Sequence, residues 1–264
     1  MSGGSSGRPR RTYVADSGID TVLRDRVALV TGASGGIGQV LARRLAESGT
    51  DLLLTYSGHA AEAEQAADHA RTLGRRAAVM QADFADPATP ARVVDAATER
   101  LGGLDVLVAA AGAGTQTSWE DVDGPLWDET MTVNVRAPFF LAQRALPRMI
   151  ERGFGRILLF SSVAALTGGV IGPHYAASKA ALHGLTHHLA ARVAGSGVTV
   201  NAIAPALIAG TRMLPFGPDD PVPPNIRVGR LGTTEEVADL SLAMLRNGYL
   251  TSKVIALDGG SYPT

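Results

Sequence analysis

Short apolar segments alternate with longer segments of helical period from about residue 25 to the end of the chain. The apolar segments are rich in Val, Leu, Ile and Ala, and they predict seven buried strands. Those strands are expected at 27–31, 51–56, 77–81, 105–110, 156–161, 198–203 and 253–257. Helices are expected between them, at 36–48, 60–73, 88–101, 125–151, 174–194 and 234–246. Near-continuous apolar strands separated by helices indicate a parallel sheet covered on both faces, and therefore one doubly wound α/β domain.

The pattern also sets the expected domain limits. Residues 1–22 are rich in Gly, Ser and Arg, so we expect a flexible tail before a single domain at 23–264. Prolines interrupt the segment 207–232, at 215, 218, 221, 223 and 224, and Met213, Leu214 and Phe216 lie among them. These apolar side chains favour a lid over an apolar pocket, and plain disorder is the alternative. The last helix should begin with a capping box, because Thr233 and Glu236 have the required spacing.

Composition and charge argue against several classes of function. The net charge of −1 provides no basic patch for nucleic acid, and the absence of Cys excludes disulfides, thiolate nucleophiles and Cys-ligated zinc. The N-terminal residues lack the apolar stretch of a signal peptide, and no later run approaches the ~18 apolar residues of a membrane span. We therefore expect a soluble, cytoplasmic protein. Of the 24 basic residues only Lys179 and Lys253 are lysines. In a chain that favours arginine so strongly, a lysine suggests a specific role for its side chain.

A glycine-rich segment directly follows the first predicted strand and runs into a helix. It reads Thr31-Gly32-Ala33-Ser34-Gly35-Gly36-Ile37-Gly38. Glycines permit a tight turn and close backbone approach, so a pyrophosphate can lie at the positive N-terminus of the helix. A lone glycine pattern can also be a turn that binds nothing, but its position after the first strand favours a dinucleotide site.

Tyr175 and Lys179 lie four residues apart in a predicted helix and therefore project from the same face. Reduction of a carbonyl needs a proton donor, and a tyrosine serves better when a nearby cation stabilises its phenolate. An exposed helix pair is the alternative, but a retained lysine in an Arg-rich chain favours chemistry. Ser162 follows the fifth strand, at the edge where such sheets bind ligands, and its hydroxyl suits the orientation of a substrate oxygen. Ser161 is the adjacent competitor.

The spacing Thr-Gly-x-x-x-Gly-x-Gly, followed by Tyr-x-x-x-Lys, resembles the short-chain dehydrogenase/reductase family in its compact form, which includes 3-oxoacyl-(acyl-carrier-protein) reductases. The resemblance covers residues 25 to 262 and implies a Rossmann fold in which NAD(P)H delivers a hydride to a carbonyl. It implies that Tyr175 protonates the substrate oxygen, and that Lys179 lowers the tyrosine pKa and contacts the nicotinamide ribose. It also selects Ser162 over Ser161 and implies that Asn134 holds a water in a proton relay.

The resemblance extends to the cofactor. Tyr56 and Ser57 stand where NAD-preferring relatives have an aspartate, and the absence of a carboxylate favours NADP(H) over NAD(H). Gly35, however, stands where many NADPH users have an arginine. The remaining residues implied at the cofactor are Asp83 at the adenine, Ala111 and Gly112 behind the fourth strand, and Pro205, Ile208 and Thr211 at the carboxamide. Ala109 and Ala110 replace the usual asparagines, Ala206 replaces the usual glycine, and Thr211 comes one residue later than usual.

These observations predict an NADPH-dependent enzyme that reduces a ketone, of 3-oxoacyl or secondary-metabolite type, to a secondary alcohol. The alternatives are an NAD-dependent secondary-alcohol dehydrogenase and a catalytically silent dinucleotide sensor. We expect a small-molecule substrate, linked or not to an acyl carrier, no nucleic-acid or membrane partner, and a homotetramer of the kind common among compact relatives. His183 and His187 lie one helical turn apart without a nearby acidic cluster, so a helix surface or interface is expected rather than a metal site. Whether His174 faces the substrate stays open.

Overall fold

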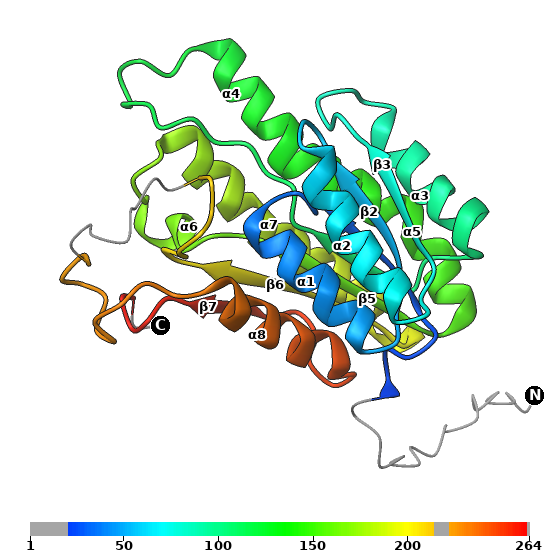
Figure 1. The fold of residues 1–264 in the computed structure, drawn as a ribbon. Helices are drawn as coiled ribbons and strands as arrows, with labels where there is room; N and C mark the ends of the chain where they lie inside the picture. The colour runs from blue at the N-terminus through cyan, green and yellow to red at the C-terminus, as the bar shows by residue number, and fades with distance from the viewer. Residues whose placement is uncertain (1–20, 214–221, 263–264) are drawn as a thin grey trace, which may run out of the picture.

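The computed structural model describes residues 21–213 and 222–262 (Figure 1). Seven strands form one sheet in the order β3-β2-β1-β4-β5-β6-β7, and each neighbouring pair is parallel. The strands are β1 (Val27–Thr31), β2 (Asp51–Tyr56), β3 (Ala77–Gln81), β4 (Val106–Ala109), β5 (Gly155–Phe160), β6 (Val198–Pro205) and β7 (Val254–Leu257). The chain reverses its direction of travel through the sheet between β1 and β4. The predicted doubly wound, seven-stranded fold is confirmed, and the sheet is parallel throughout.

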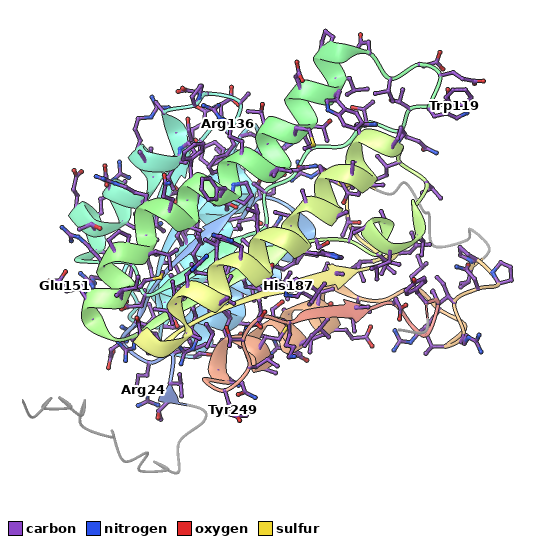
Figure 2. The ribbon with its side chains drawn as sticks, turned by 180° about the vertical axis from the view of Figure 1, so that it is seen from behind. Arg24, Trp119, Arg136, Glu151, His187 and Tyr249 are labelled. Carbon is purple, nitrogen blue, oxygen red and sulfur yellow. The ribbon has the colours of Figure 1, made fainter. Side chains whose placement is uncertain are left out.

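Two layers of helices cover the sheet, one on each face (Figures 1 and 2). One layer holds α1 (Gly36–Glu47), α2 (Ala60–Thr72) and α8 (Thr234–Arg246), and the other holds α3 (Thr89–Leu101), α5 (Ala137–Arg152) and α7 (Pro173–Val193). Successive side chains of a strand point to opposite faces, so Leu29 joins the core beneath the second layer and Val30 the core beneath the first. Both side chains are fully buried, which explains why β1 reads as an unbroken apolar run.

The predicted helix 125–151 is divided in the structure. It consists of α4 (Gly124–Met131), a π-helical turn η2 (Thr132–Arg136) and α5 (Ala137–Arg152). Asp123 caps the start of α4, where its side chain accepts a 2.9 Å hydrogen bond from the backbone N–H of Leu126. A π-helical turn inserts one residue into the helical repeat, so it changes the face from which Asn134 projects. Periodicity predicted the helix correctly but not this local rotation.

Other elements differ from prediction at their ends. A short helix α6 (Ala164–Thr167) and a 3₁₀ turn η3 (Ala194–Ser196) were not predicted, because neither is long enough to show a period. β4 is shorter than the predicted 105–110, and β6 extends two residues beyond the predicted 198–203. The capping box of α8 is confirmed, since Thr233 and Glu236 exchange hydrogen bonds of 3.2 and 2.9 Å between side chain and backbone.

The predicted tail and lid fall partly outside the described residues, namely at residues 1–20 and at 214–221. Val22 packs against the core and Leu23 is fully buried in a turn ahead of β1. Both described flanks of the lid are tied together, because Ile208 and Gly232 form an isolated parallel bridge. None of the helices within 21–213 and 222–262 combines the length and apolar character required to cross a membrane.

An acidic residue at the start of β2 joins this strand to β3. The Asp51 carboxylate is buried, and it lies 2.9 Å from Arg75 Nη2 and 2.7 Å from Arg76 Nε. It also accepts a 3.0 Å hydrogen bond from the Arg76 backbone N–H. Burial opposes ionisation, but the Arg76 hydrogen bonds and the charge of Arg75 outweigh it and hold the pKa of Asp51 below its ordinary value. The arrangement fixes the start of the edge strand β3.

The variant Asp51→Asn should lower the free energy of unfolding at pH 7 by about 2 kcal/mol, because hydrogen bonds from charged donors lose their ionised acceptor. The folded-state pKa of Asp51 lies below its unfolded value, so the contribution is complete above about pH 4 and is lost as the pH falls further. Urea unfolding of both proteins as a function of pH measures the difference. Asp239→Asn is the control, since the Asp239 side chain is 66% exposed and lies 3.6 Å from Arg44. A difference that persists unchanged well below pH 4 would contradict the role given to the carboxylate.

Candidate active site

A cavity of about 710 Å³ opens at the carboxyl ends of the strands, where the chain reverses its direction through the sheet. Parallel α/β sheets offer a crevice at this point because the loops from neighbouring strands run to opposite faces. The loops after β1, β4, β5 and β6 all contribute walls to it. Every residue predicted to bind cofactor or substrate borders this cavity, and Asn134 lies behind its wall.

The glycine-rich loop after β1 forms one end of the cavity, with Gly32, Ser34, Gly35, Gly36, Ile37 and Gly38 in its wall. Gly32 has a φ of +69°, which favours glycine, and a Cβ there would lie 2.9 Å from Ala111 Cα. The Ala111 backbone N–H donates a 3.0 Å hydrogen bond to Thr31 Oγ1, so the loops after β1 and β4 are in direct contact. Gly35 is the N-cap of α1 and supplies no side-chain cap. The helix therefore directs its first N–H groups toward any anion bound there.

Tyr56, Ser57 and Asp83 border the cavity beyond this loop, at the ends of β2 and β3. The wall has no carboxylate at the end of β2. Asp83 is exposed, and its carboxylate accepts a 2.9 Å hydrogen bond from the Ala85 backbone N–H. The aspartate thus makes the turn after β3 and also faces the cavity, so the two interpretations of this residue are compatible.

Tyr175 and Lys179 occupy the opposite end, on one face of α7. Both are buried, at 6% and 4% exposure, and the Lys179 ammonium lies 5.5 Å from the centre of the tyrosine ring. Burial raises the pKa of the Tyr175 phenol to about 12, although the Ser162 hydroxyl opposes part of that rise. Burial also lowers the pKa of the Lys179 ammonium to about 8. Burial thus dominates over the acidification of Tyr175 expected from Lys179, and both groups carry their protons at pH 7.

The two adjacent serines after β5 have different surroundings. Ser162 borders the cavity, and its Oγ accepts a 3.1 Å hydrogen bond from the Ala164 backbone N–H. Ser161 also borders the cavity, but this residue is buried and its hydroxyl donates a 2.9 Å hydrogen bond to the Lys179 carbonyl. It also lies 2.8 Å from His183 Nε2. Ser162 is thus the serine whose hydroxyl lowers the Tyr175 pKa, and its role in orienting the substrate oxygen stays a prediction.

Asn134 is fully buried in the π-helical turn and fixes the loop after β4. Its side chain exchanges two 2.8 Å hydrogen bonds with the backbone of Ala113 and donates one of 2.9 Å to Ser178 Oγ. A Cβ at Gly112 would lie 3.2 Å from Lys179 Nζ and 3.3 Å from Asn134 Oδ1, so the amide and the ammonium converge on this glycine. The water relay stays a prediction, and the structure shows in addition that Asn134 positions the loop after β4, a role that the sequence did not suggest.

The predicted carboxamide end consists of Pro205, Ile208 and Thr211, and all three border the cavity. The Thr211 hydroxyl donates a 2.9 Å hydrogen bond to the Ile208 carbonyl within its own turn. The next residue, Arg212, also borders the cavity and was not predicted. In a chain with 22 arginines, no sequence signal distinguishes this one. The side chains of Val170, Ile171 and Leu207 were likewise missed at the substrate end.

The histidines lie outside the cavity wall. His174 is fully buried and His187 Nδ1 lies 3.1 Å from Ser252 Oγ on the outer side of α7. Within the described part of the chain, no group of three or more His, Cys, Asp and Glu side chains has an arrangement suited to a metal ion.

Comparison with known proteins identifies the family of this chain. The sequence profile of the short chain dehydrogenases matches residues 26–219. The chain belongs to this family. An L-rhamnose 1-dehydrogenase (NADP(+)) of Thermoplasma acidophilum is 33% identical over 249 residues, which cover 90% of this chain and 96% of that enzyme. An acetoacetyl-CoA reductase of Allochromatium vinosum is also 33% identical, over 90% of this chain and 98% of its own.

Solved structures agree with this assignment. A short chain dehydrogenase from Burkholderia cenocepacia in complex with NADP has a TM-score of 0.82 and 36% identity, covering 90% of this chain and 98% of its own. A blue fluorescent protein from a metagenomic library in complex with NADPH has a TM-score of 0.83 and 34% identity, covering 91% and 99%. The chain is thus an oxidoreductase of the short chain dehydrogenase family.

The residues present in this dehydrogenase fit a nicotinamide dinucleotide. Close backbone contacts at Gly32 and Gly38 leave no room for side chains, so the loop after β1 offers bare backbone to a pyrophosphate. At the other end, Tyr175 and Lys179 border the cavity with a hydroxyl and an ammonium group, which would suit the hydroxyls of a nicotinamide ribose. The cavity volume of about 710 Å³ lies within the range of small-molecule and cofactor sites.

The variant Gly38→Ala should weaken NADPH binding at least about tenfold, because the added methyl group displaces the loop backbone that faces the phosphates. A Cβ at this position would lie 2.9 Å from Ala33 Cα and would overlap the Gly32 carbonyl oxygen. Gly184→Ala is the control, since a Cβ at that helical position meets nothing within 4 Å. Fluorescence titration with NADPH measures the dissociation constants. Equal affinities for Gly38→Ala and the unmodified protein would refute the role given to the loop.

Proposed function

We propose that this short chain dehydrogenase reduces an apolar ketone to a secondary alcohol with NADPH. The observation that carries the proposal is the pair formed by the protonated Tyr175 phenol and the Lys179 ammonium at one end of a cavity that begins at a phosphate-binding loop. The pair supplies a proton and a compensating charge at the same place. A dinucleotide sensor without catalytic activity has no use for it.

Bound along this cavity, the reduced nicotinamide would supply a hydride to the carbonyl carbon. The chain's own residues do the rest. Ser162 donates a hydrogen bond to the carbonyl oxygen, and Tyr175 transfers its phenolic proton to that oxygen as negative charge develops there. The Lys179 ammonium stabilises the resulting phenolate. Both groups are buried, so the attraction between their charges is stronger than it would be in water. Asn134 keeps the loop after β4 in place through Ala113.

Three observations support NADPH as the cofactor. The end of β2 carries Tyr56 and Ser57, so no carboxylate there repels a 2′-phosphate. The L-rhamnose dehydrogenase relative is named as NADP(+)-dependent, and two similar solved structures contain NADP or NADPH. Another rhamnose dehydrogenase relative, from a Sphingomonas strain, is named for both NAD and NADP. The absence of a carboxylate at the β2 end therefore carries the proposed preference for NADPH.

The substrate end of the cavity supports an apolar ketone of 3-oxoacyl or similar type. Its wall between β5 and α7 contains Val163, Val170 and Ile171, and the lid adds Leu207, Met213 and Ile226. The polar side chains that the segment between β5 and α7 adds to the wall are Ser161, Ser162 and Thr167, and none of its residues at the cavity is charged. The lid adds Thr211, Arg212 and Asn225. A sugar would leave several hydroxyls against these apolar side chains, which is unfavourable. An acyl chain would bury methylene groups there instead. An NAD-dependent alcohol dehydrogenase is the second candidate function, and the lack of a carboxylate at the β2 end argues against NAD as its cofactor.

The variant Tyr175→Phe tests this function. It should lower kcat for ketone reduction at least about a hundredfold, because the proton donor is absent, while NADPH affinity changes little. Tyr249→Phe is the control, because Tyr249 is 98% exposed and lies far from the cavity (Figure 2). Oxidation of NADPH with a panel of medium-chain 3-oxo esters and other apolar ketones is followed at saturating cofactor. Full turnover by Tyr175→Phe would exclude the proposed mechanism, and NADPH binding without turnover of any ketone would favour a sensor.

We also propose that the enzyme is a homotetramer. Helices α5 and α7 lie on the near face of the molecule in Figure 2, and Phe140 and Ile150 on α5 are 37% and 41% exposed. Ala176, Ala177 and Ala180 give α7 a face with small, partly exposed side chains, which permits close helix packing. Light scattering over a range of concentrations should give four times the chain mass of 27.3 kDa. A monomer mass at all concentrations would contradict this proposal.

A further inference from the structure

The charges around the cofactor cavity are unequally distributed. Among the described residues, four charged side chains border the cavity: Asp83, Glu129, Lys179 and Arg212. Lys179 is buried beside Tyr175, so Arg212 is the remaining cation. A dinucleotide brings two negative charges in its pyrophosphate, and NADPH brings a further phosphate group. The N-terminus of α1 offsets only about half an elementary charge.

Arg212 lies against the phosphate-binding loop. Its Nη2 donates a hydrogen bond to the carbonyl oxygen of Ser34, which also accepts a 3.1 Å hydrogen bond from Gln39 Nε2. Two residues earlier, the Gly210 carbonyl packs so closely on Gly36 that a Cβ at Gly36 would overlap it. The segment 210–212 therefore lies directly over the loop where the phosphates are expected.

The backbone that carries Arg212 is attached to the core. Ile208 is 5% exposed and bridges to Gly232, and the Ala209 N–H donates a 2.9 Å hydrogen bond to the Gly232 carbonyl. The Gly232 N–H in turn donates one of 3.1 Å to the Leu207 carbonyl. Arg212 thus lies four residues from a fixed point, so less conformational freedom is lost when its side chain binds an anion.

The guanidinium of Arg212 uses only part of its hydrogen-bonding capacity within the described residues. No carboxylate of the described residues lies within ion-pair distance of it, whereas Arg230 in the same segment lies 2.6 Å from Glu236. A guanidinium has five N–H donors, and here one of them meets a neutral carbonyl. Phosphate oxygens are stronger acceptors for this group and match its fork geometry.

We propose that Arg212 is the cofactor-phosphate ligand of this enzyme, which it supplies from the lid side of the cavity. It provides the positive charge that Gly35 does not provide in the loop itself. By leaving the Ser34 carbonyl for a phosphate oxygen, Arg212 ties the lid segment 207–213 to the bound cofactor. The inference rests on the proposed nicotinamide cofactor. The pyrophosphate and the 2′-phosphate share the required chemistry, and a comparison of NADH with NADPH distinguishes them.

The test compares the dissociation constants of NADPH and NADH for the unmodified protein, Arg212→Gln and Arg212→Lys, measured by calorimetry without substrate. Arg212→Gln should bind NADPH about tenfold more weakly, because a charge-assisted hydrogen bond is lost, and Arg212→Lys should recover part of the loss. Arg227→Gln is the matched control. Arg227 is also exposed in the lid but does not border the cavity, so its variant should bind like the unmodified protein.

Each outcome has a distinct meaning. An equal loss for NADPH and NADH supports Arg212 as a ligand of the pyrophosphate, and a loss confined to NADPH supports it as a ligand of the 2′-phosphate. Unchanged affinity of Arg212→Gln for both dinucleotides, or an equal loss in Arg227→Gln, overturns the inference and leaves the proposed function intact. If the unmodified protein binds neither dinucleotide, the proposed function itself is overturned.

Discussion

The Lys179 ammonium is a buried positive charge without a carboxylate partner among the described residues. It donates one hydrogen bond, of 2.9 Å, to the Phe160 carbonyl, although an ammonium has three donors. Burying a charge costs several kcal/mol unless hydrogen bonds and opposite charges compensate for it. The pKa of Lys179 is lowered by burial, which shows that its surroundings do not fully compensate for the loss of water around the charge. Its place on α7 keeps the lysine buried against the end of β5, where Phe160 accepts its hydrogen bond.

Asn134 and Tyr175 lie close to this ammonium. The Asn134 side chain converges with Lys179 on Gly112, and its other hydrogen bonds hold the loop after β4 in place. Tyr175 lies on the same helical face and is kept protonated by burial. Free donors on Lys179 suit ribose hydroxyls and a developing phenolate, both of which arrive only when the cavity is filled. Before a ligand binds, the site therefore holds a buried positive charge that is only partly compensated. Such an arrangement is typical of sites that trade stability for function.

Sequence reasoning was accurate where a residue's role follows from its local neighbours. Leu29 and Val30 are apolar because β1 is buried on both faces, and Gly38 is required by contacts with Gly32 and Ala33 of the same loop. It was less accurate where the role depends on another element. The π-helical turn that aims Asn134 at Ala113 leaves no periodic trace, because it adds a single residue to a long helix. The fact that burial dominates the Tyr175 pKa likewise requires the packed structure.

Arg212 shows the same limit in sharper form. Nothing in its sequence context separates it from the other arginines, and its position depends on the bridge between Ile208 and Gly232, which lie far apart in the segment. That bridge places one cation beside the phosphate loop, while α7 places the other beside the tyrosine. The two cations lie at opposite ends of a cavity whose substrate wall is apolar. Under the proposed function, the cation beside the loop after β1 meets the phosphate groups of the dinucleotide. The cation on α7 meets the phenolate that forms during reduction, so each cation has its own anionic partner.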